Sequence, residues 1–310
     1  MSDSGERYVV PPELDGERLD KAAAKLAKGL SVARVKRAIE GGHVRVDGRR
    51  RAKGAPVRAG ETITIVLEEV PAPDAPAVAD PDAQLVVRFE SPAVLVVDKP
   101  AGQPTAPLRA GERGTLVNAL LGRFPALAGI GYGPREPGVL HRLDTGTSGL
   151  VIVARSAAAF AVLRAALLDG RIEKKYLLVC ASDGLADEGT IAHPIANHPK
   201  DQRRVLACIT PRDVMRYTPR QASTRYRVIR RGGAHALVEA TVEKALRHQI
   251  RAHFASIEHP LVGDALYGSE EKVDGKRHAL HASFVAFAGE KDVGAFQVES
   301  PLPAELEALI

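Results

Sequence analysis

The hydrophobic pattern of residues 17–67 predicts two short helices followed by short strands. The first helix is indicated by apolar residues that recur at helical spacing, namely Leu19, Ala23, Leu26 and Leu30. Ser31 is a favourable N-cap for the second helix, and Gly42 is suited to end it. The stretches 43–46 and 62–65 alternate apolar and polar residues, as half-buried strands do. These elements make a compact N-terminal unit.

A stretch rich in Pro, Ala and Asp at residues 71–83 separates this unit from the rest of the chain. Such a composition favours a semi-extended linker between two separate cores. We therefore expect a first domain at residues 1–70, a linker at 71–83 and a second domain at 84–310.

The second domain has the pattern of strands interleaved with helices. A hairpin is predicted at residues 85–97, and the β-branched run 150–153 predicts a buried strand. Ser156 is a favourable N-cap for a helix, and residues 173–179 alternate in character as a strand does. The pattern predicts a domain that mixes helices with a sheet.

The composition is that of a soluble globular protein, with 45% hydrophobic and 26% charged residues. The formal net charge of +5 favours an anionic partner. Cys180 and Cys208 have no metal-binding spacing and predict no disulfide framework, which fits a reducing cytoplasm. Arginines interrupt the longest apolar stretch, so we expect no membrane span, and the N-terminus lacks the apolar core of a signal peptide.

Positive charge is concentrated in two segments. Residues 34–58 carry nine basic and two acidic residues, net +7, and residues 198–231 carry ten and two, net +8. A charge run is often only a solvated face. The second segment is interleaved with Tyr217 and Tyr226, however, which favours a rim that faces RNA.

Residues 141–149 read His-Arg-Leu-Asp-Thr-Gly-Thr-Ser-Gly and hold the most distinctive chemistry. Their single carboxylate, Asp144, lies on a turn before the buried strand, where a loop can aim it at a substrate. Asp-Thr-Gly also occurs in pepsin-like proteases, which need two carboxylates that share a proton. This chain has no second copy of the motif, so we reject the protease interpretation.

The complete nine-residue stretch resembles the catalytic motif of the RluA-type pseudouridine synthases, which modify large-subunit ribosomal RNA and some tRNAs. The resemblance implies that Asp144 is the catalytic residue and that Arg142 inserts near the position vacated by the target base. Lys99 lies in a Lys-Pro-x-Gly element similar to one of the family, and we expect a structural role for it. Tyr176, in a Lys-x-Tyr element, would stack on the target base.

A fourth family motif, directly after Lys244, resembles Gly-Arg-Thr-His-Gln-Ile-Arg at residues 245–251, with Ala245, Leu246 and Arg247 departing from its first three positions. Leu246 occupies the place of an arginine that the family has near the catalytic Asp. We expect Arg247, one position later, to pair with Asp144, with Lys244 as the alternative. Ile250 is expected to support the site.

The N-terminal unit resembles the S4 RNA-binding domain, whose second helix and following loop grip the RNA backbone. The resemblance and the charge pattern predict RNA contacts from basic residues of this unit and of the loop near residue 200. These are Arg34, Lys36, Arg37, Arg49, Arg50, Arg51, Lys200, Arg203 and Arg204.

These resemblances imply an α+β fold, with a small S4 domain linked to a catalytic domain built on a mixed, mostly antiparallel sheet. The implied reaction is isomerisation of a uridine in structured RNA, either ribosomal RNA or tRNA, to pseudouridine. A carboxylate near the sugar is needed, as a nucleophile at C1′ or as a base at C2′. The target nucleotide must also leave the base stack.

We expect no cofactor and no metal, because the chain has no Gly-rich phosphate loop and its histidines neighbour arginines rather than acidic ligands. The expected partner is RNA, and a monomer in the cytoplasm without membrane association is predicted. The alternative is an RNA-binding scaffold of the same fold that has no catalytic activity. It stays open because Leu246 occupies the place of the family's arginine.

Overall fold

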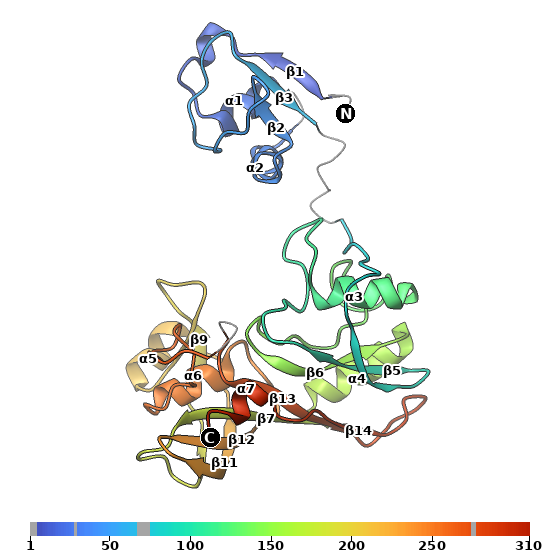
Figure 1. Ribbon diagram of the computed structural model, residues 1–310, viewed down its shortest axis with the longest axis vertical. Helices are drawn as coiled ribbons and strands as arrows, with labels where there is room; N and C mark the ends of the chain where they lie inside the picture. Colours follow the sequence, from blue (N-terminus) through green and yellow to red (C-terminus); the bar gives the residue numbers. More distant parts are fainter. Residues whose placement is uncertain (1–4, 28–29, 67–74, 274–276) are drawn as a thin grey trace. The chain divides into compact units, whose positions relative to one another are not determined.

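The computed structural model describes residues 5–27, 30–66, 75–273 and 277–310. The chain divides into two compact units, one of residues 1–75 and 109–111 and the other of residues 76–108 and 112–310 (Figure 1). Of the expected linker, residues 71–83, the part up to residue 74 lies outside the described residues. Beyond it, the Ala77 amide donates to the Pro134 carbonyl at 2.9 Å and the Asp80 amide to the Asn118 carbonyl at 2.9 Å. Residues 77–80 therefore belong to the second unit and are not a free linker.

The first unit is a three-stranded antiparallel sheet with helices packed on it. Its elements are β1 (Glu6–Val9), the 3-10 helix η1 (Pro12–Leu14), α1 (Leu19–Leu26), α2 (Val32–Gly41), β2 (Val44–Val46) and β3 (Thr62–Ile65), with strand order β1-β3-β2. The predicted caps of α2 are confirmed: Ser31 accepts from the Arg34 amide, and Gly42 ends the helix with a φ of 81°. Leu19, Val35 and Ile63 are fully buried in a core of this unit's own.

The second unit is built around one large sheet, flanked by helices. Its first half contains β4 (Val86–Glu90), β5 (Val94–Lys99), α3 (Leu116–Arg123), the 3-10 helix η3 (Pro125–Leu127), β6 (Ser148–Ala154), α4 (Ala157–Leu168) and β7 (Ile172–Ala181). Its second half contains β8 (Glu188–Ile191), β9 (Ile195–Asn197), β10 (Val205–Ala207), α5 (Pro211–Tyr217), β11 (Thr224–Gly232), β12 (His235–Thr241), α6 (Gln249–Ser256), β13 (Leu280–Phe287), β14 (Phe296–Glu299) and α7 (Ala304–Glu307).

The strand order of the large sheet is β4-β5-β6-β13-β7-β12-β11-β8, and β14 also pairs with β13. The β6–β13 pair is parallel, whereas the other pairs of this sheet are antiparallel. The predicted fold class, a mixed and mostly antiparallel sheet with helices, is confirmed. The predicted hairpin is β4–β5, and the predicted buried strand is β6, all of whose residues are buried.

One close approach in the centre of this sheet positions the site. Ala282 on β13 pairs with Gly149 on β6 and with Tyr176 on β7. Gly149 has a φ of 112°, and a Cβ there would lie 2.3 Å from the Ala282 carbonyl oxygen, so only glycine fits. The register places the loop before β6 and the tyrosine of β7 on either side of β13.

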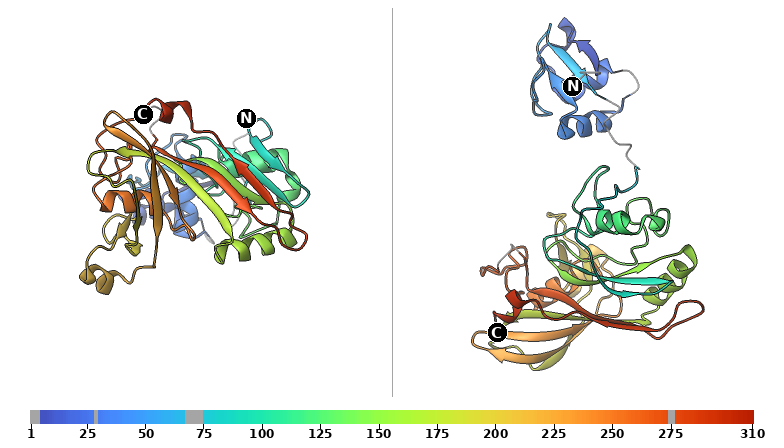
Figure 2. Two further views of the ribbon diagram at one scale, coloured as in Figure 1. Left: turned by 90° about the horizontal axis from the view of Figure 1, so that it is seen from below. Right: turned by 45° about the vertical axis from the view of Figure 1, so that its right-hand side comes forward.

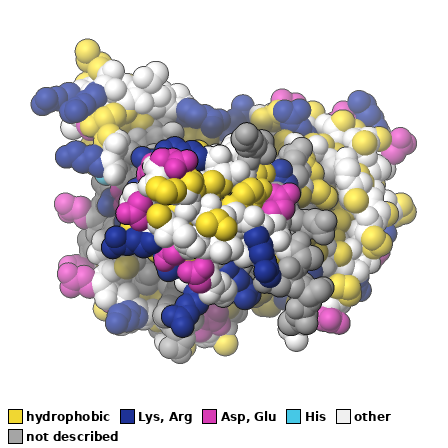
Figure 3. Space-filling view, turned by 90° about the horizontal axis from the view of Figure 1, so that it is seen from above, with side chains coloured by type: hydrophobic (Ala, Val, Ile, Leu, Met, Phe, Trp, Pro, Cys, Tyr) yellow, Lys and Arg dark blue, Asp and Glu magenta, His cyan; other side chains and the backbone are white. Residues whose placement is uncertain are grey.

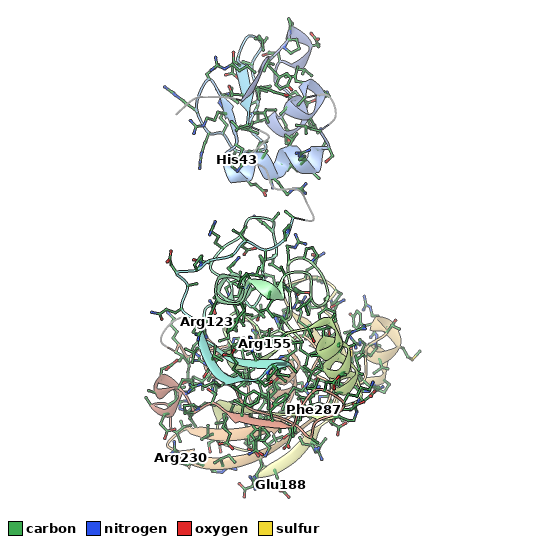
Figure 4. The ribbon with its side chains drawn as sticks, turned by 90° about the vertical axis from the view of Figure 1, so that its right-hand side faces the viewer. His43, Arg123, Arg155, Glu188, Arg230 and Phe287 are labelled. Atoms are coloured by element: carbon green, nitrogen blue, oxygen red, sulfur yellow. The ribbon has the colours of Figure 1, made fainter. Side chains whose placement is uncertain are left out.

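The helices divide between the two sides of the unit. α3 and α4 lie on the side of β5 and β6, and α6 lies on the side of β11 and β12 (Figures 1 and 2). Arg123 and Arg155 are labelled in Figure 4. Their guanidinium carbons lie 5.5 and 5.6 Å from the centroid of the Phe124 ring at the end of α3. Among the described residues, no helix combines the length and apolar character that crossing a membrane requires.

Deletion of residues 1–75 tests the independence of the units. We expect the remaining chain to unfold in one cooperative transition, because its core shares no residue with that of the first unit. RNA affinity should fall, and each lost phosphate contact should lower the slope of log K against log salt by about 0.7 for single strands or about 0.9 for duplex. Binding titrations at several salt concentrations measure this. An unchanged slope would mean that the basic face of α2 contacts only water.

Candidate active site

The loop that carries Asp144 is fixed on both sides of that residue. The Thr105 hydroxyl bonds both the amide and the carbonyl of Leu143, at 3.1 and 2.8 Å. The Gly102 amide donates to the Thr145 carbonyl at 2.7 Å, and the Thr147 amide donates to the Asp144 carbonyl at 3.0 Å. A loop with so many backbone contacts holds its carboxylate in a defined place.

Lys99 supports the same loop through hydrogen bonds from its buried side chain. Its side chain is fully buried, and its Nζ donates to the carbonyls of Pro100 and Gln103 at 2.9 and 2.7 Å and approaches that of Thr145 at 3.4 Å. Burial lowers the pKa of Lys99 to about 7, against the opposing effect of the Asp144 carboxylate. These contacts give Lys99 the structural role that we predicted.

Arg251, from the first turn of α6, is the cation beside Asp144. Its Nη1 donates to Asp144 Oδ2 at 2.8 Å, while its Nε and Nη2 donate to the two oxygens of Asp264 at 2.7 and 2.9 Å. The Asp264 side chain is 1% exposed and that of Arg251 7%, whereas that of Asp144 is 25% exposed. Asp264 therefore fixes the guanidinium from the buried side, and Asp144 faces the open side.

The pKa of Arg251 follows from the same contacts. Burial lowers it, but the hydrogen bonds and charge of Asp264, together with the charge of Asp144, raise it above the ordinary value for arginine. The Tyr267 ring covers the guanidinium, with 5.1 Å between the guanidinium carbon and the ring centroid. Arg251 thus stays cationic and keeps one orientation.

His248 lies immediately before α6, in a left-handed conformation with a φ of 54°. The Tyr267 hydroxyl accepts from the Val205 amide at 2.9 Å and lies 3.1 Å from His248 Nδ1. The hydroxyl hydrogen is therefore free to donate to Nδ1, which leaves the imidazole proton on Nε2, 3.6 Å from Asp144 Oδ1. Burial lowers the pKa of His248, so the ring is neutral at physiological pH.

A pocket opens over Asp144 and Arg251. Its walls include Tyr176 from β7, Ile250 from α6 and Leu246 from the turn before α6. Burial and the Asp144 charge raise the pKa of Tyr176, which therefore presents an uncharged ring. Arg142 lies at the exposed rim, where its guanidinium bonds Glu136 at 3.0 Å. The pocket therefore combines an apolar and aromatic wall with an anchored carboxylate.

The expectation that Arg247 pairs with Asp144 is wrong. Arg247 is exposed and donates to the Gln202 carbonyl at 2.7 Å, because it lies in the turn before α6 and points to the neighbouring loop. Lys244, the alternative, is exposed as well. One helical turn later, Arg251 points back to Asp144. The start of α6 at Gln249 decides which arginine enters the site.

The predicted RNA-binding residues lie at the surface in two groups. In the first unit, Arg34, Lys36 and Arg37 are on α2, and Arg49, Arg50 and Arg51 follow β2. Arg51 is held by Glu61 at 2.7 and 2.9 Å, so it has less freedom than its neighbours. In the second unit, Lys200, Arg203 and Arg204 lie between β9 and β10.

The sequence reasoning did not predict that Arg251 and Asp264 lie beside Asp144, although Arg251 ends the fourth motif. A helical reading of the stretch after Leu246 would have placed His248 and Arg251 on one face, since they are three positions apart. Nothing in the sequence indicates that Asp264 lies against Arg251. That contact depends on the tertiary fold.

Comparisons with known proteins agree with this geometry. Residues 93–256 match the RNA pseudouridylate synthase family, and residues 17–63 match the S4 domain. The chain belongs to the RNA pseudouridylate synthase family. This synthase is 35% identical to "Ribosomal large subunit pseudouridine synthase D" of Xanthomonas campestris pv. campestris, over 100% of this chain and 93% of that protein. It is 36% identical to an uncharacterized RNA pseudouridine synthase of Chloroflexus aurantiacus, over 97% and 92%.

A solved structure shares the fold of the synthase. "Human RNA Pseudouridylate Synthase Domain Containing 1" aligns with a TM-score of 0.56 and 23% identity, over 75% of this chain and 89% of that one. The activity follows from the family match and from the relatives of 35 and 36% identity: the synthase isomerises uridine in RNA, and its S4 unit binds RNA.

Arg251→Met should abolish pseudouridine formation, while Arg247→Met should leave kcat within a few-fold of wild type. The first change removes the cation that holds Asp144, and the second removes only a bond to a surface carbonyl. Single-turnover assays on both variants, alongside Arg251→Lys, measure this. Equal losses in the two methionine variants would contradict the assignment of Arg251.

Asp264→Asn should lower kcat about 10- to 100-fold with little change in RNA affinity, because Arg251 loses its buried anchor. It should also lower the free energy of unfolding by about 3 kcal/mol, because a buried cation loses a charged partner. Asp187→Asn is the matched control: it removes a 2.6 Å ion pair with Arg231 whose aspartate is 88% exposed, for a change below about 1 kcal/mol. Turnover assays and thermal unfolding distinguish the two variants.

Proposed function

We propose that the synthase converts a uridine of large-subunit ribosomal RNA to pseudouridine, with Asp144 as the catalytic residue. The observation that carries the proposal is the anchored carboxylate, with Asp144 at the open side of a guanidinium whose other side is fixed by Asp264. The names of the relatives in Xanthomonas and Pseudomonas aeruginosa, both large-subunit synthases, support ribosomal RNA as the substrate.

The pocket supports the steps of such an isomerisation in turn. A flipped uracil enters against Tyr176, whose raised pKa keeps it neutral, so that no phenolate repels Asp144. Arg142, at the rim, is placed to fill the space in the RNA that the base leaves. Ile250 and Leu246 line the pocket and limit the entry of water.

Asp144 then acts on the ribose. In one route Asp144 attacks C1′ and forms an ester bond to it as the N1–C1′ bond breaks; in the other it removes the C2′ proton as that bond breaks and leaves a C1′–C2′ double bond. The uracil then turns, and when C5 attacks C1′ the ester bond breaks or the proton returns to C2′. C5 bonds to C1′, the hydrogen of C5 is released as a proton, and N1 gains a proton, so that product and substrate are isomers. Arg251 is already bonded to Asp144 Oδ2, which leaves Oδ1 to approach the sugar.

We further propose that the synthase acts as a monomer. Its substrate, ribosomal RNA, supports action in the cytoplasm. The basic residues of α2 and of the loop between β9 and β10 are the proposed RNA contacts, with Lys36, Arg37, Lys200 and Arg203 among them.

The test is Asp144→Asn in the complete chain. The variant should fold, bind in vitro transcribed large-subunit ribosomal RNA with wild-type affinity and form no pseudouridine, because the amide lacks the reactive oxygen. Pseudouridine mapping in cells that carry wild type, the variant or a deletion then locates the uridine. Turnover by the variant would refute the catalytic role of Asp144, and an inactive wild-type chain that still binds RNA would support the scaffold alternative.

A further inference from the structure

His248 occupies a strained position beside the candidate site. It precedes α6 with a φ of 54°, a left-handed conformation that costs free energy for a residue with a side chain. Strain of this kind persists only where the surrounding structure holds it, and it is concentrated at functional sites. Lysine and arginine side chains are prominent on the surface in Figure 3, whereas hardly any histidine is visible there. Only 13% of the His248 side chain is exposed, so its ring belongs to the interior of the site.

Tyr267 fixes the protonation of the His248 ring. The Tyr267 hydroxyl accepts from the Val205 amide at 2.9 Å, and burial raises the pKa of Tyr267, so the hydroxyl keeps its hydrogen. Within the part of the chain that the structure describes, the acceptor for that hydrogen is His248 Nδ1, 3.1 Å away. A ring nitrogen that accepts is unprotonated, so the proton of the neutral ring lies on Nε2. Because the Tyr267 ring also covers the guanidinium of Arg251, one tyrosine fixes both neighbours of Asp144.

The two oxygens of Asp144 have different neighbours. Oδ2 accepts from Arg251 Nη1 at 2.8 Å, whereas His248 Nε2 lies 3.6 Å from Oδ1, just beyond a hydrogen bond. Contacts of this length are common in enzymes without substrate and tighten when the substrate is bound. The neutral ring offers Oδ1 a donor without a second positive charge. An imidazolium would instead form an ion pair with Oδ1 and hold it away from the ribose.

The charged groups around His248 come from several segments. Asp144 lies on the loop before β6, Arg247 on the turn before α6, Arg251 on α6 and Asp264 beyond that helix. Burial is the largest effect on the pKa of His248 and lowers it; the two carboxylates oppose this, and the two guanidinium groups add to it. The net result is a pKa below the ordinary value for histidine, so the charged ring forms only in acid solution.

We propose that His248 is a positioning residue for Asp144, a proposal that rests on the proposed function. Tyr267 holds the ring with its proton on Nε2, and this N–H directs Oδ1 towards the ribose while Arg251 holds Oδ2. In the route through an ester, the same N–H stabilises the carboxylate that returns when the ester bond breaks. In the other route it orients Oδ1 towards the C2′ proton. Both routes need the uncharged ring.

Two substitutions of His248 separate positioning from a purely structural role. Gln carries an amide N–H at the place of Nε2, whereas Asn carries one only at the place of Nδ1. Asn, however, tolerates the left-handed backbone better than Gln does. Positioning therefore predicts that His248→Gln keeps kcat within about tenfold of wild type, while His248→Asn lowers kcat about 100-fold without a change in RNA affinity. A purely structural role predicts the reverse order, with the lower melting temperature in His248→Gln.

His259→Asn is the matched control. His259 lies away from the pocket, and its Nδ1 is 3.0 Å from the Ala181 carbonyl oxygen, a hydrogen bond that the amide of Asn can keep. This variant should have the kcat, KM and melting temperature of wild type.

The pH dependence of kcat provides a second test. Because the neutral ring is required, wild-type kcat should be constant above the pKa of His248 and fall as the pH falls through it. His248→Gln cannot become charged, so its kcat should not show this fall. Tyr267→Phe keeps a ring over Arg251 but removes the hydroxyl that favours neutral His248, so the fall should move to higher pH. Its melting temperature should also be lower, because the buried Val205 amide loses its acceptor.

We would measure kcat and KM with in vitro transcribed large-subunit ribosomal RNA across the acid and neutral range. NMR of the imidazole nitrogens determines the tautomer without any turnover, with the His248 signals assigned by their loss in His248→Asn. We expect a proton on Nε2 and none on Nδ1 at neutral pH. A charged ring or a proton on Nδ1 would overturn the proposal, as would a pH profile of Tyr267→Phe that matches wild type.

The failure of this proposal can be told apart from the failure of the proposed function. If Asp144→Asn is inactive but His248→Asn is more active than His248→Gln, Asp144 remains the catalytic residue and only the positioning role is refuted. If Asp144→Asn turns over the transcript, the proposed function is refuted, and the positioning role is refuted with it.

Discussion

The guanidinium of Arg251 is buried between Asp144 and Asp264, and a cation in that place is stable only while both carboxylates face it. The two carboxylates differ in exposure: Asp264 is buried and fixes the guanidinium, whereas Asp144 is open to a substrate. Tyr267 over the guanidinium and the Thr105 bonds to the Asp144 loop fix the remaining degrees of freedom. The direction of the Asp144 carboxylate is therefore a property of the core rather than of a flexible loop.

The sheet brings these parts together through one irregularity. β6 runs parallel to β13 in a sheet that is otherwise antiparallel, and Gly149 permits their backbones to meet. The Asp144 loop precedes β6, and Tyr176 lies across β13 from it. A side chain at Gly149 would separate the carboxylate from the aromatic wall, even though it would touch neither.

Much of this fold could be predicted from sequence, because its signals are local. The Ser31 and Ser156 caps, the buried run of β6 and the composition of the motif around Asp144 each depend on residues near in the chain. The partner of Asp144 could not be predicted in the same way. Arg247 and Arg251 are both cations of one motif, and only the residue at which α6 begins separates them. The contact between Asp264 and Arg251 could not be predicted from sequence either, because tertiary packing brings the two residues together.

The separation of contacts along the chain imposes an order on folding during synthesis. The first unit closes its core with residues up to Ile65, so it can fold while the rest is still being made. The proposed active site cannot fold so early: Asp144 contacts Arg251, 107 positions later, and β6 pairs with β13 through His281 and Ala282. Non-local pairing of this kind is slow to form. A nascent or prematurely terminated chain therefore already contains the RNA-binding unit, while its catalytic centre does not yet exist.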